Sequence, residues 1–276
     1  MTLSCILLSL ILDAFLGEPV WIWSKIPHPT VLMGRIIKWC ELKYNNGINR
    51  KNKGILFIAF MVIFLAIFGY LIERLPFSAI WKILIVAILL SHKSLTEHVT
   101  AVSLGLQKNL SQGRTAVAMI VGRDTANLAE TDIARSAIES AAENFSDGII
   151  APLFWFLIGG LPGILIYKFV NTSDSMIGYK NIQYNQFGWA AARLDDLLNW
   201  IPARLSGLLI CIVHQNNSAL NIMWRDAKLH RSPNAGWPES AMAGVLDVSI
   251  SGPRSYEGVI KNYPFVNVDG KKKLTA

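Results

Sequence analysis

Residues 55–72 constrain the fold of this chain more than any other segment, because these 18 residues include no charged side chain. A helix needs about 20 apolar residues, within a range of roughly 17–25, to cross the hydrocarbon core of a bilayer. A second apolar block, residues 77–91, follows directly and contains Lys82 as its one charged residue. Pro76 separates the two blocks and interrupts a continuous helix. The pair therefore predicts a tight transmembrane hairpin.

Three further apolar blocks resemble these two, and each contains a single charged residue. The first of these three, residues 1–16, lacks the basic start and the small-residue cleavage site of a signal peptide. We therefore expect it to be retained in the mature protein. Only 16% of the residues are charged, against about 25% in a soluble domain, which argues against an ordinary soluble enzyme. We predict an all-α, polytopic integral membrane protein with about five apolar helical segments and helical polar cytoplasmic stretches. The apolar blocks are residues 1–16, 55–72, 77–91, 149–170 and 201–213.

The chain is predicted to form a single membrane-embedded domain, residues 1–276, in which polar stretches connect the apolar blocks. Loops rich in Lys and Arg tend to remain in the cytoplasm, and residues 17–54 carry seven Lys and Arg against two acids. This places residues 17–54 in the cytoplasm. The basic residues form no dense stripe and no recognition motif, which argues against nucleic-acid binding. The polar stretches are residues 92–148, 171–200 and 215–276.

Helix-breaking residues interrupt the block 149–170, where residues 159–163 read GGLPG. One interpretation, which we favour, is a re-entrant hairpin whose exposed backbone is covered by protein. It returns residues 171–200 to the cytoplasm, beside 92–148. The alternative is a single kinked span, which places 171–200 outside.

The usual sequence signatures of catalytic sites are missing. Cys5, Cys40 and Cys211 lie far apart, and we interpret them as buried hydrophobic residues rather than a disulfide framework or a zinc site. There is no GxxxxGK[ST], HExxH, GxSxG or GxGxxG pattern. A chemical site must therefore be sought in the polar stretches.

One helix face within residues 123–148 gathers charged side chains. Asp132, Arg135, Glu139 and Glu143 are spaced by three, four and four residues, which places them on one face of a helix. Such a row suits a magnesium ion or a substrate ammonium, with the arginine for an anion. The competing interpretation is the solvated face of an amphipathic helix.

Further polar residues lie where the helical and apolar segments end. Asn144 and Asp147 precede the block 149–170, and Asp174 and Lys180 follow it. Nothing in the spacing fixes the roles of the last two, and a helix cap with a loop explains them equally well.

Two later stretches add candidate residues. Arg193, Asp195 and Asp196 crowd one helical segment, where Arg193 and Asp196 can simply pair. Trp237 and Glu239 lie in a segment with two prolines and a glycine, for which a rigid structural turn is the default interpretation.

Together, these motifs resemble the CobD/CbiB family of adenosylcobinamide-phosphate synthases. They are long, ordered and spread over nearly the whole chain. In chain order the matching motifs are Leu12-Asp13, Leu16-Gly17-Glu18-Pro19, Pro27-His28-Pro29, Met33-Gly34-Arg35, Val121-Gly122-Arg123-Asp124-Thr125, Glu139-Ser140, Ala142-Glu143-Asn144, Ser146-Asp147-Gly148, Ala151-Pro152-Leu153-Phe154-Trp155, Asn171-Thr172, Asp174-Ser175-Met176, Gly178-Tyr179-Lys180, Arg193-Leu194-Asp195-Asp196, Ser232-Pro233-Asn234-Ala235-Gly236-Trp237-Pro238-Glu239 and Gly252-Pro253.

The resemblance implies an integral membrane enzyme of cobalamin biosynthesis. Such an enzyme joins (R)-1-amino-2-propanol, or its O-phosphate, to adenosylcobyric acid through an amide bond, to give adenosylcobinamide or its phosphate. The reaction implies ATP and magnesium as cofactors and an adenosylcorrinoid as substrate. Family chains usually continue with another apolar segment, so we expect this chain to be either a truncated sequence that lacks a C-terminal segment or a shortened member of the family.

The expected roles follow from this chemistry, since a carboxylate must be activated before an amine can attack it. The expected catalytic residues are Glu139, Glu143, Asp147 and Asp174. The expected magnesium ligands are Asp124, Glu143 and Asp147. The residues expected to bind substrate are Arg123, Asn144, Lys180, Arg193, Asp195, Asp196, Trp237 and Glu239. Among them, the ring of Trp237 is expected to pack on the flat macrocycle.

Two other classes of function remain open from the sequence. One is a non-catalytic corrinoid-binding or transport membrane protein, which a broken helix near residues 159–163 would suit. The other is a membrane scaffold for other enzymes of the cobalamin pathway. Expected partners are the corrinoid, aminopropanol phosphate and the lipid bilayer, with a homo-oligomer or pathway enzymes as further candidates. The expected location is the inner (cytoplasmic) membrane, multi-pass, with the active site facing the cytoplasm.

Overall fold

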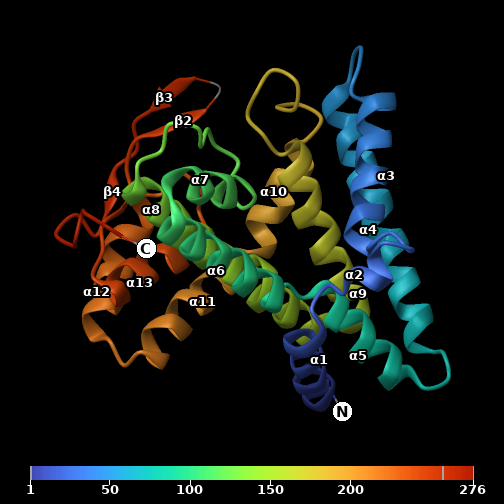
Figure 1. Ribbon diagram of the computed structural model, residues 1–276. Helices are drawn as coiled ribbons and strands as arrows, with labels where there is room; N and C mark the ends of the chain where they lie inside the picture. Colours follow the sequence, from blue (N-terminus) through green and yellow to red (C-terminus); the bar gives the residue numbers. More distant parts are fainter. Residues whose placement is uncertain (1, 257, 276) are drawn as a thin grey trace. The chain divides into compact units, whose positions relative to one another are not determined.

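The computed structural model describes residues 2–256 and 258–275, and most of its regular structure is helical (Figure 1). The chain divides into two compact units, each built from two separate stretches. Unit 1 comprises Met1–Lys93 and Ala151–Asn199, and unit 2 comprises Ser94–Ile150 and Trp200–Ala276. The predicted all-α class is confirmed, with short strands as an addition near the end of unit 2.

Unit 1 is a helical assembly around α4 and α9. Its helices are α1 (Thr2–Leu16), α2 (Val20–Trp23), α3 (Pro29–Tyr44), α4 (Arg50–Glu73), α5 (Ser78–Leu89), α9 (Ala151–Ile177) and α10 (Trp189–Leu198). Helix α3 begins where the sequence favours it, because Pro29 occupies the first turn and the His28 side chain accepts a hydrogen bond from the Thr30 amide.

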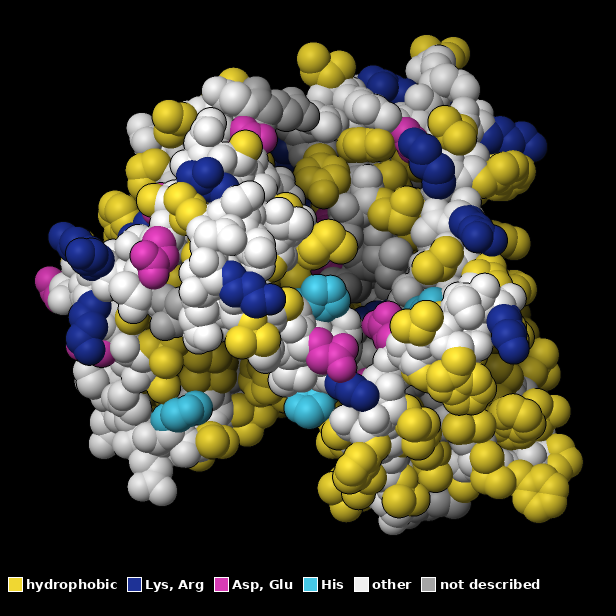
Figure 2. All heavy atoms as spheres, in the orientation of Figure 1, with side chains coloured by type: hydrophobic (Ala, Val, Ile, Leu, Met, Phe, Trp, Pro, Cys, Tyr) yellow, Lys and Arg dark blue, Asp and Glu magenta, His cyan; other side chains and the backbone are white. Residues whose placement is uncertain are grey.

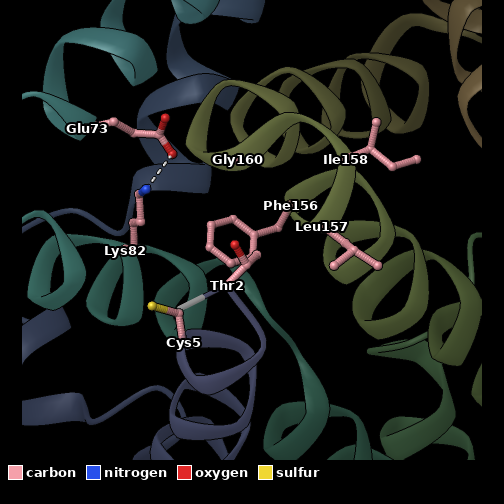
Figure 3. Close-up of a pocket in the computed structure, with 8 residues that line it drawn as sticks. All are labelled: Thr2, Cys5, Glu73, Lys82, Phe156, Leu157, Ile158 and Gly160. Carbon is pink, nitrogen blue, oxygen red and sulfur yellow. Dashed lines mark ion pairs between the residues drawn. The ribbon is translucent and has the colours of Figure 1, made fainter.

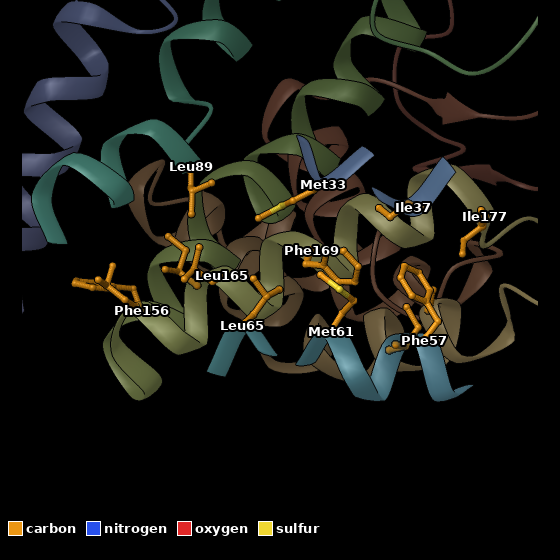
Figure 4. Close-up of a cluster of buried hydrophobic side chains, with 14 of the residues drawn as sticks. Met33, Ile37, Phe57, Met61, Leu65, Leu89, Phe156, Leu165, Phe169 and Ile177 are labelled. Carbon is orange, nitrogen blue, oxygen red and sulfur yellow. The ribbon is translucent and has the colours of Figure 1, made fainter. Parts of the chain in front are cut away.

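The apolar core of unit 1 lies where α3, α4, α5 and α9 meet (Figure 4). Phe57 on α4 packs edge-to-face on Phe169 of α9 and stacks on Phe187, with ring centroids 5.8 Å and 6.3 Å apart. Gly54 approaches the Phe187 carbonyl so closely that a side chain would not fit there. Residues 178–188 are therefore fixed at the Gly54 end of α4.

Three helical runs within the described residues are long and apolar enough to cross a membrane: Arg50–Glu73, Ser78–Lys108 and Glu130–Ile177. The consecutive helices Trp189–Leu198 and Trp200–Val213 supply a fourth if they are counted as one broken span. Helix α1 is apolar but shorter. Every predicted apolar block is thus helical, in agreement with a polytopic membrane protein.

The surface over α1 and α5 is covered with hydrophobic side chains (Figure 2). On α1, Leu3, Leu7 and Phe15 are 68%, 61% and 77% exposed. Contiguous apolar surface of this kind is uncommon on soluble monomers and suits contact with lipid.

Helix α9 is broken at Gly160, whose φ of 59° and ψ of −148° are not helical. The Gly160 break lies beside Glu73, the last residue of α4, and Figure 3 shows Glu73 and Lys82 pointing toward each other there. Gly163 contacts the carbonyl of Trp155, which a straight helix would hold about 12 Å away along its axis. The chain therefore turns back at Gly160, and the re-entrant hairpin in the membrane stays a prediction.

Unit 2 is built around α8 and α13. Its elements are α6 (His92–Lys108), α7 (Leu110–Ala118), α8 (Glu130–Phe145), a π-helical turn η1 (Ser146–Ile150), α11 (Trp200–Val213), α12 (Asn217–Asp226), a 3-10 turn η2 (Ala227–Leu229), α13 (Gly236–Leu246), β1 (Ile250–Ser251), β2 (Arg254–Tyr256), β3 (Val259–Lys261) and β4 (Phe265–Val266). Helices α7 and α12 begin at Asn109 and Asn216, whose side chains accept hydrogen bonds from the first-turn amides.

The strands form two small antiparallel ribbons, β1 with β4 and β2 with β3. Each strand has only two or three residues, too few for an alternating pattern to be visible in the sequence. One face of α8 packs inward, since Ile133 is fully buried and Ala137 is 7% exposed. The opposite face of α8 carries the charged residues.

Candidate functional site

The carboxylate of Glu139 on α8, in unit 2, is buried, with the residue only 2% exposed. One oxygen accepts a hydrogen bond from the backbone N–H of Ser251 on β1 at 2.6 Å. The other oxygen pairs with the guanidinium groups of Arg123 and Arg254, the latter at 3.2 Å. We call Glu139, Arg123, Arg254 and Ser251 the Glu139 cluster. Charge-assisted bonds of this kind are about twice as strong as neutral ones.

Glu143 lies one helical turn further along α8 and differs from Glu139 in its exposure. Its side chain is accessible to solvent, but it lies deep among neighbouring atoms. Burial raises the pKa of its carboxyl group, and the positive charges of Arg231, Arg254 and Arg123 oppose this shift. The Glu139 cluster therefore has an open side, where a carboxylate faces several guanidinium groups. A ligand that carries both negative and positive groups would find partners of both signs there.

A second buried acid, Glu239 on α13, lies near the cluster and is 1% exposed. Its Oε1 is 3.6 Å from Nε2 of His230, and its Oε2 has no hydrogen-bond partner among the described residues. Burial, followed by the negative charges of Glu139 and Glu143, raises the pKa of Glu239 well above its ordinary value.

His230 is held in its neutral form. Burial, helped by the positive charges of Arg254 and Arg231, lowers the pKa of His230 to about 4. Its Nδ1 accepts a hydrogen bond from the Ser232 amide at 3.1 Å, so the ring proton is on Nε2, toward Glu239.

The pKa of His230 predicts a loss of stability in acid. Between pH 6.5 and pH 4 the unfolded chain binds a proton that folded His230 does not. The free energy of unfolding therefore falls as the pH falls through this window, by up to about 3 kcal/mol. In the His230→Gln variant this contribution is absent. Thermal unfolding of the detergent-solubilised protein from pH 7 to pH 4 should show a shallower acid loss for the variant. If the melting temperatures of the wild type and the variant fell equally between pH 7 and pH 4, the lowered pKa of His230 would be contradicted.

The residues predicted to bind magnesium do not gather into one site. The carboxylate of Asp124 accepts hydrogen bonds from Ser255 Oγ at 2.6 Å and from the Gly258 amide at 2.9 Å, which ties its loop to the β2–β3 ribbon. Asp147 lies half-buried in the π-helical turn. Across the described parts of the chain, no group of three or more His, Cys, Asp and Glu side chains has the arrangement of a metal site. Magnesium binding by Asp124, Glu143 and Asp147 stays a prediction.

Trp237 is enclosed by protein, which corrects its expected role. It is 5% exposed, its ring packs edge-to-face on Trp224 at 4.9 Å, and the Arg204 guanidinium lies 4.6 Å from its centroid. A flat macrocycle would have no free face of this ring to cover. Asn144, in contrast, is exposed, and its amide donates to the Ser140 carbonyl at 2.9 Å.

Unit 1 holds a separate buried polar network. The Tyr167 hydroxyl donates to Asn199 Oδ1 at 3.0 Å, and Asn199 Nδ2 donates to Asp195 at 3.0 Å. The other oxygen of Asp195 accepts from Asn171 at 3.3 Å. We call these four residues the Asp195 network. It connects α9 to α10, and Asp174 interacts electrostatically with Asp195 at its edge.

The remaining candidates of unit 1 lie at its surface. Lys180 is exposed and acts electrostatically on Asp196. Arg193 and Asp196 form an exposed i,i+3 pair at 3.7 Å, as the simpler interpretation expects. Pairs of this kind contribute little to stability.

The predicted site residues thus divide between the two units. In unit 2 the structure brings together Arg123, Glu139, Glu143 and Glu239, and in unit 1 it brings together Asp174 and Asp195. Sequence reasoning missed three residues around the Glu139 cluster, namely His230, Arg231 and Arg254. The sequence did offer a signal for them, because each lies directly beside a motif of the resemblance. His230 and Arg231 precede the SPNAGWPE turn, and Arg254 follows Gly252-Pro253.

Comparison with known proteins agrees with the motifs. A family model described as "CobD/Cbib protein" matches residues 6–276. The chain is 47% identical to the cobalamin biosynthesis protein CobD of Brucella anthropi, over 98% of this chain and 88% of that protein. It is 46% identical to proteins of the same name from a Sinorhizobium species (98% and 88% covered) and from Rhodobacter capsulatus (93% and 84% covered). No solved structure matches it.

Proposed function

The chain belongs to the CobD/CbiB family, and on this premise we propose that it is a multi-pass enzyme of the cytoplasmic membrane that forms an amide bond in cobalamin biosynthesis. The proposed reaction joins (R)-1-amino-2-propanol, or its O-phosphate, to a carboxylate of adenosylcobyric acid with consumption of ATP. We propose that the basic segments and the site face the cytoplasm, as the positive-inside rule favours.

The Glu139 cluster carries this proposal. Two arginines with largely buried side chains converge on one carboxylate, and Glu143 lies in the same electrostatic environment. Guanidinium groups match carboxylates and phosphates with two parallel hydrogen bonds. The proposed amide ligase must hold both of these groups, because its acyl donor is a carboxylate and its activating reagent, ATP, is a phosphoanhydride.

The chemistry proposed at this site has two steps. First, the corrinoid carboxylate attacks the γ-phosphorus of ATP, which forms an acyl phosphate and releases ADP. The amine lone pair then attacks the acyl carbon, and the carbon–oxygen bond to phosphate breaks with its electron pair going to the phosphate. Arg123 and Arg231 would stabilise the phosphoryl charge. Glu143 would accept the proton that the ammonium group must lose before it attacks, and the second proton lost by the nitrogen would leave with the phosphate.

This assignment predicts that Glu143→Gln lowers the turnover number about 100-fold or more, the usual effect of removing a positioned proton acceptor. Because Glu143 is exposed, we expect the thermal stability of the variant to stay close to that of the wild type. The matched control is Glu130→Gln, an exposed carboxylate in the first turn of the same helix, for which we expect unchanged turnover.

The decisive assay supplies purified protein with adenosylcobyric acid, aminopropanol phosphate, ATP and magnesium, and measures the amide product. Product formation, reduced in Glu143→Gln and not in Glu130→Gln, is the expected result. Binding of the corrinoid without turnover would instead favour the non-catalytic binding or transport function. Full activity of Glu143→Gln would remove this residue from the proposed mechanism.

A further inference from the structure

Unit 1 contains a pocket of about 250 Å³ at the place where several helices end or break (Figure 3). Helix α4 contributes its last residue, Glu73, and α5 contributes Lys82. The start of α1 and the break in α9 complete the lining with Thr2, Cys5, Phe156, Leu157, Ile158 and Gly160. Sites for drug-sized ligands usually measure about 300–1,000 Å³, so this pocket suits a small polar group rather than a corrinoid.

We propose that this pocket binds the headgroup of a membrane phospholipid that carries a primary ammonium group, as phosphatidylethanolamine does. In this arrangement the lipid phosphate accepts hydrogen bonds from Lys82, and the lipid ammonium group donates to Glu73. The acyl chains lie on the exposed apolar surface beside the pocket. The proposal concerns the contact of the protein with its bilayer and does not depend on the proposed reaction.

The pocket lies at the level of the bilayer where headgroups are found. The apolar run of α4 ends at Glu73, so the chain leaves the hydrocarbon core there. Around the turn between α4 and α5, Tyr70, Phe77 and Trp81 are 51%, 79% and 44% exposed. Exposed aromatic side chains are enriched where the membrane meets water. The surrounding phospholipids are therefore the nearest source of a phosphate group for this pocket.

The charged side of the pocket is an ion pair that can accept further hydrogen bonds and donate others. Lys82 Nζ lies 3.2 Å from Glu73 Oε1, and the two side chains are 17% and 24% exposed. The hydrogen bond that this carboxylate accepts, from the Leu161 amide at 3.1 Å, is on the same oxygen. Among the described residues, Glu73 Oε2 accepts none, which leaves it for an ammonium donor. The Lys82 ammonium has three donors, of which Glu73 Oε1 can take one.

The opposite side of the pocket is apolar. Figure 3 shows Leu157 and Ile158 of α9 across from the ion pair, and their residues are 53% and 62% exposed. The helices α1 and α5, which also line the pocket, carry the apolar surface seen in Figure 2. An amphiphile can therefore place its polar head at the ion pair and its hydrocarbon chains on this surface.

The choice of headgroup follows from the two opposite charges. A headgroup that is only negative, such as that of phosphatidylglycerol, would hold its phosphate close to the Glu73 carboxylate without a compensating positive charge. The quaternary ammonium group of phosphatidylcholine has no N–H to donate to Glu73. Phosphatidylethanolamine has a phosphate and an ammonium group with three donors, so it complements Lys82 and Glu73 together.

Lipid binding to the delipidated full chain in detergent tests the proposal. Native mass spectrometry compares phosphatidylethanolamine, phosphatidylcholine and phosphatidylglycerol with identical acyl chains. We expect phosphatidylethanolamine to occupy one site about tenfold more tightly than phosphatidylcholine, as expected for one charge-assisted hydrogen bond. Equal affinities for these two lipids, or a preference for phosphatidylglycerol, would overturn the proposal.

Two variants assign the preference to the pocket. Glu73→Gln keeps an acceptor for the Leu161 amide but removes the charge, and should abolish the preference for ethanolamine over choline. Lys82→Met should weaken phosphatidylethanolamine binding about tenfold. The matched control is Arg74→Met, which removes an exposed cation of the same turn outside the lining and should change neither value. If Lys82→Met and Arg74→Met behave alike, the pocket is not the site.

A labelling experiment keeps the test decisive if these variants do not fold. The native cysteines Cys5, Cys40 and Cys211 are buried, so a cysteine introduced by Leu157→Cys is the accessible thiol. In nanodiscs, its reaction with maleimide should be slower with phosphatidylethanolamine than with phosphatidylcholine. The control is Ile67→Cys, at a comparably exposed position of α4 outside the lining, where the two lipids should give the same rate. Equal rates at position 157 would overturn the proposal.

A soluble analogue separates a lipid from a free phosphorylated amine. Glycerophosphoethanolamine has the same headgroup but no acyl chains, so it cannot use the apolar surface beside the pocket. We expect it to bind at least about tenfold more weakly than the lipid, since each tenfold step needs only the burial of two CH₂ groups. Binding as tight as that of the lipid would overturn the assignment to a phospholipid.

Discussion

Replacement of Glu139 by glutamine should lower the free energy of unfolding by about 3–5 kcal/mol, the usual result of breaking a buried ion pair on one side. Glu139 is 2% exposed and neutralises Arg123 and Arg254 while it accepts the Ser251 amide. Glutamine keeps the shape of the side chain but leaves two guanidinium groups without their counter-charge. Since Arg123 is also proposed to stabilise the phosphoryl charge, amide formation should be lost as well.

The matched control is Asp269→Asn. Asp269 also pairs with an arginine, Arg225, at 3.9 Å, but its side chain is 84% exposed. Solvent screens such a pair, so we expect a change below about 1 kcal/mol. Thermal melting of both variants in the same detergent measures the contrast. If the two variants have the same melting temperature, the buried ion pairs of Glu139 do not stabilise unit 2 as expected.

Replacement of Gly160 by alanine is expected to cost about 3 kcal/mol or more. The backbone at Gly160 (φ 59°, ψ −148°) lies in a region that only glycine occupies readily, and forcing another residue there costs about 1–3 kcal/mol. A Cβ at this position would also lie 2.5 Å from Glu73 Oε1. That oxygen accepts the Leu161 amide at 3.1 Å and pairs with Lys82 at 3.2 Å, so both contacts would be disturbed.

The neighbouring residue provides the control. Gly159 has no positive φ, and a Cβ there would meet nothing within 4 Å. Gly159→Ala should therefore change stability by no more than about 1 kcal/mol, in either direction. The melting temperature and the yield of folded protein of the two variants test this difference. Equal tolerance at both positions would argue against a chain reversal at Gly160.

The helices were predictable because their signals are local. The chargeless block 55–72 became the centre of Arg50–Glu73, and the GGLPG stretch marked the position of the break in α9. The β1–β4 pairing could not be predicted in this way. Ile250 pairs with Val266, and a periodicity read over a few neighbouring residues carries no information about a partner so far along the chain. Its strands exist because β1 packs on α8, which a sequence pattern of two residues cannot reveal.

The candidate site was predictable only along α8. The spacing of four residues placed them on one face of the helix: Asp132, Arg135, Glu139 and Glu143. It could not show that Glu139 would be buried in ion pairs while Glu143 would remain accessible to a ligand. In the structure Arg135 pairs with Asp132 at 2.9 Å, Glu139 is buried, and Glu143 remains exposed. The difference comes from Arg254 and Ser251, which lie far away in the sequence and whose approach depends on tertiary packing.

The bond between Ser251 and Glu139 spans 112 residues of sequence, and this separation affects the order of events during synthesis. At about 5–20 residues per second, a ribosome needs about 6–20 s to add the partners of Glu139 after α8 has been made. During that interval Glu139 lacks both Ser251 and Arg254. Unit 2 can therefore acquire its native electrostatics only late in translation, once Ser251 and Arg254 have both been made.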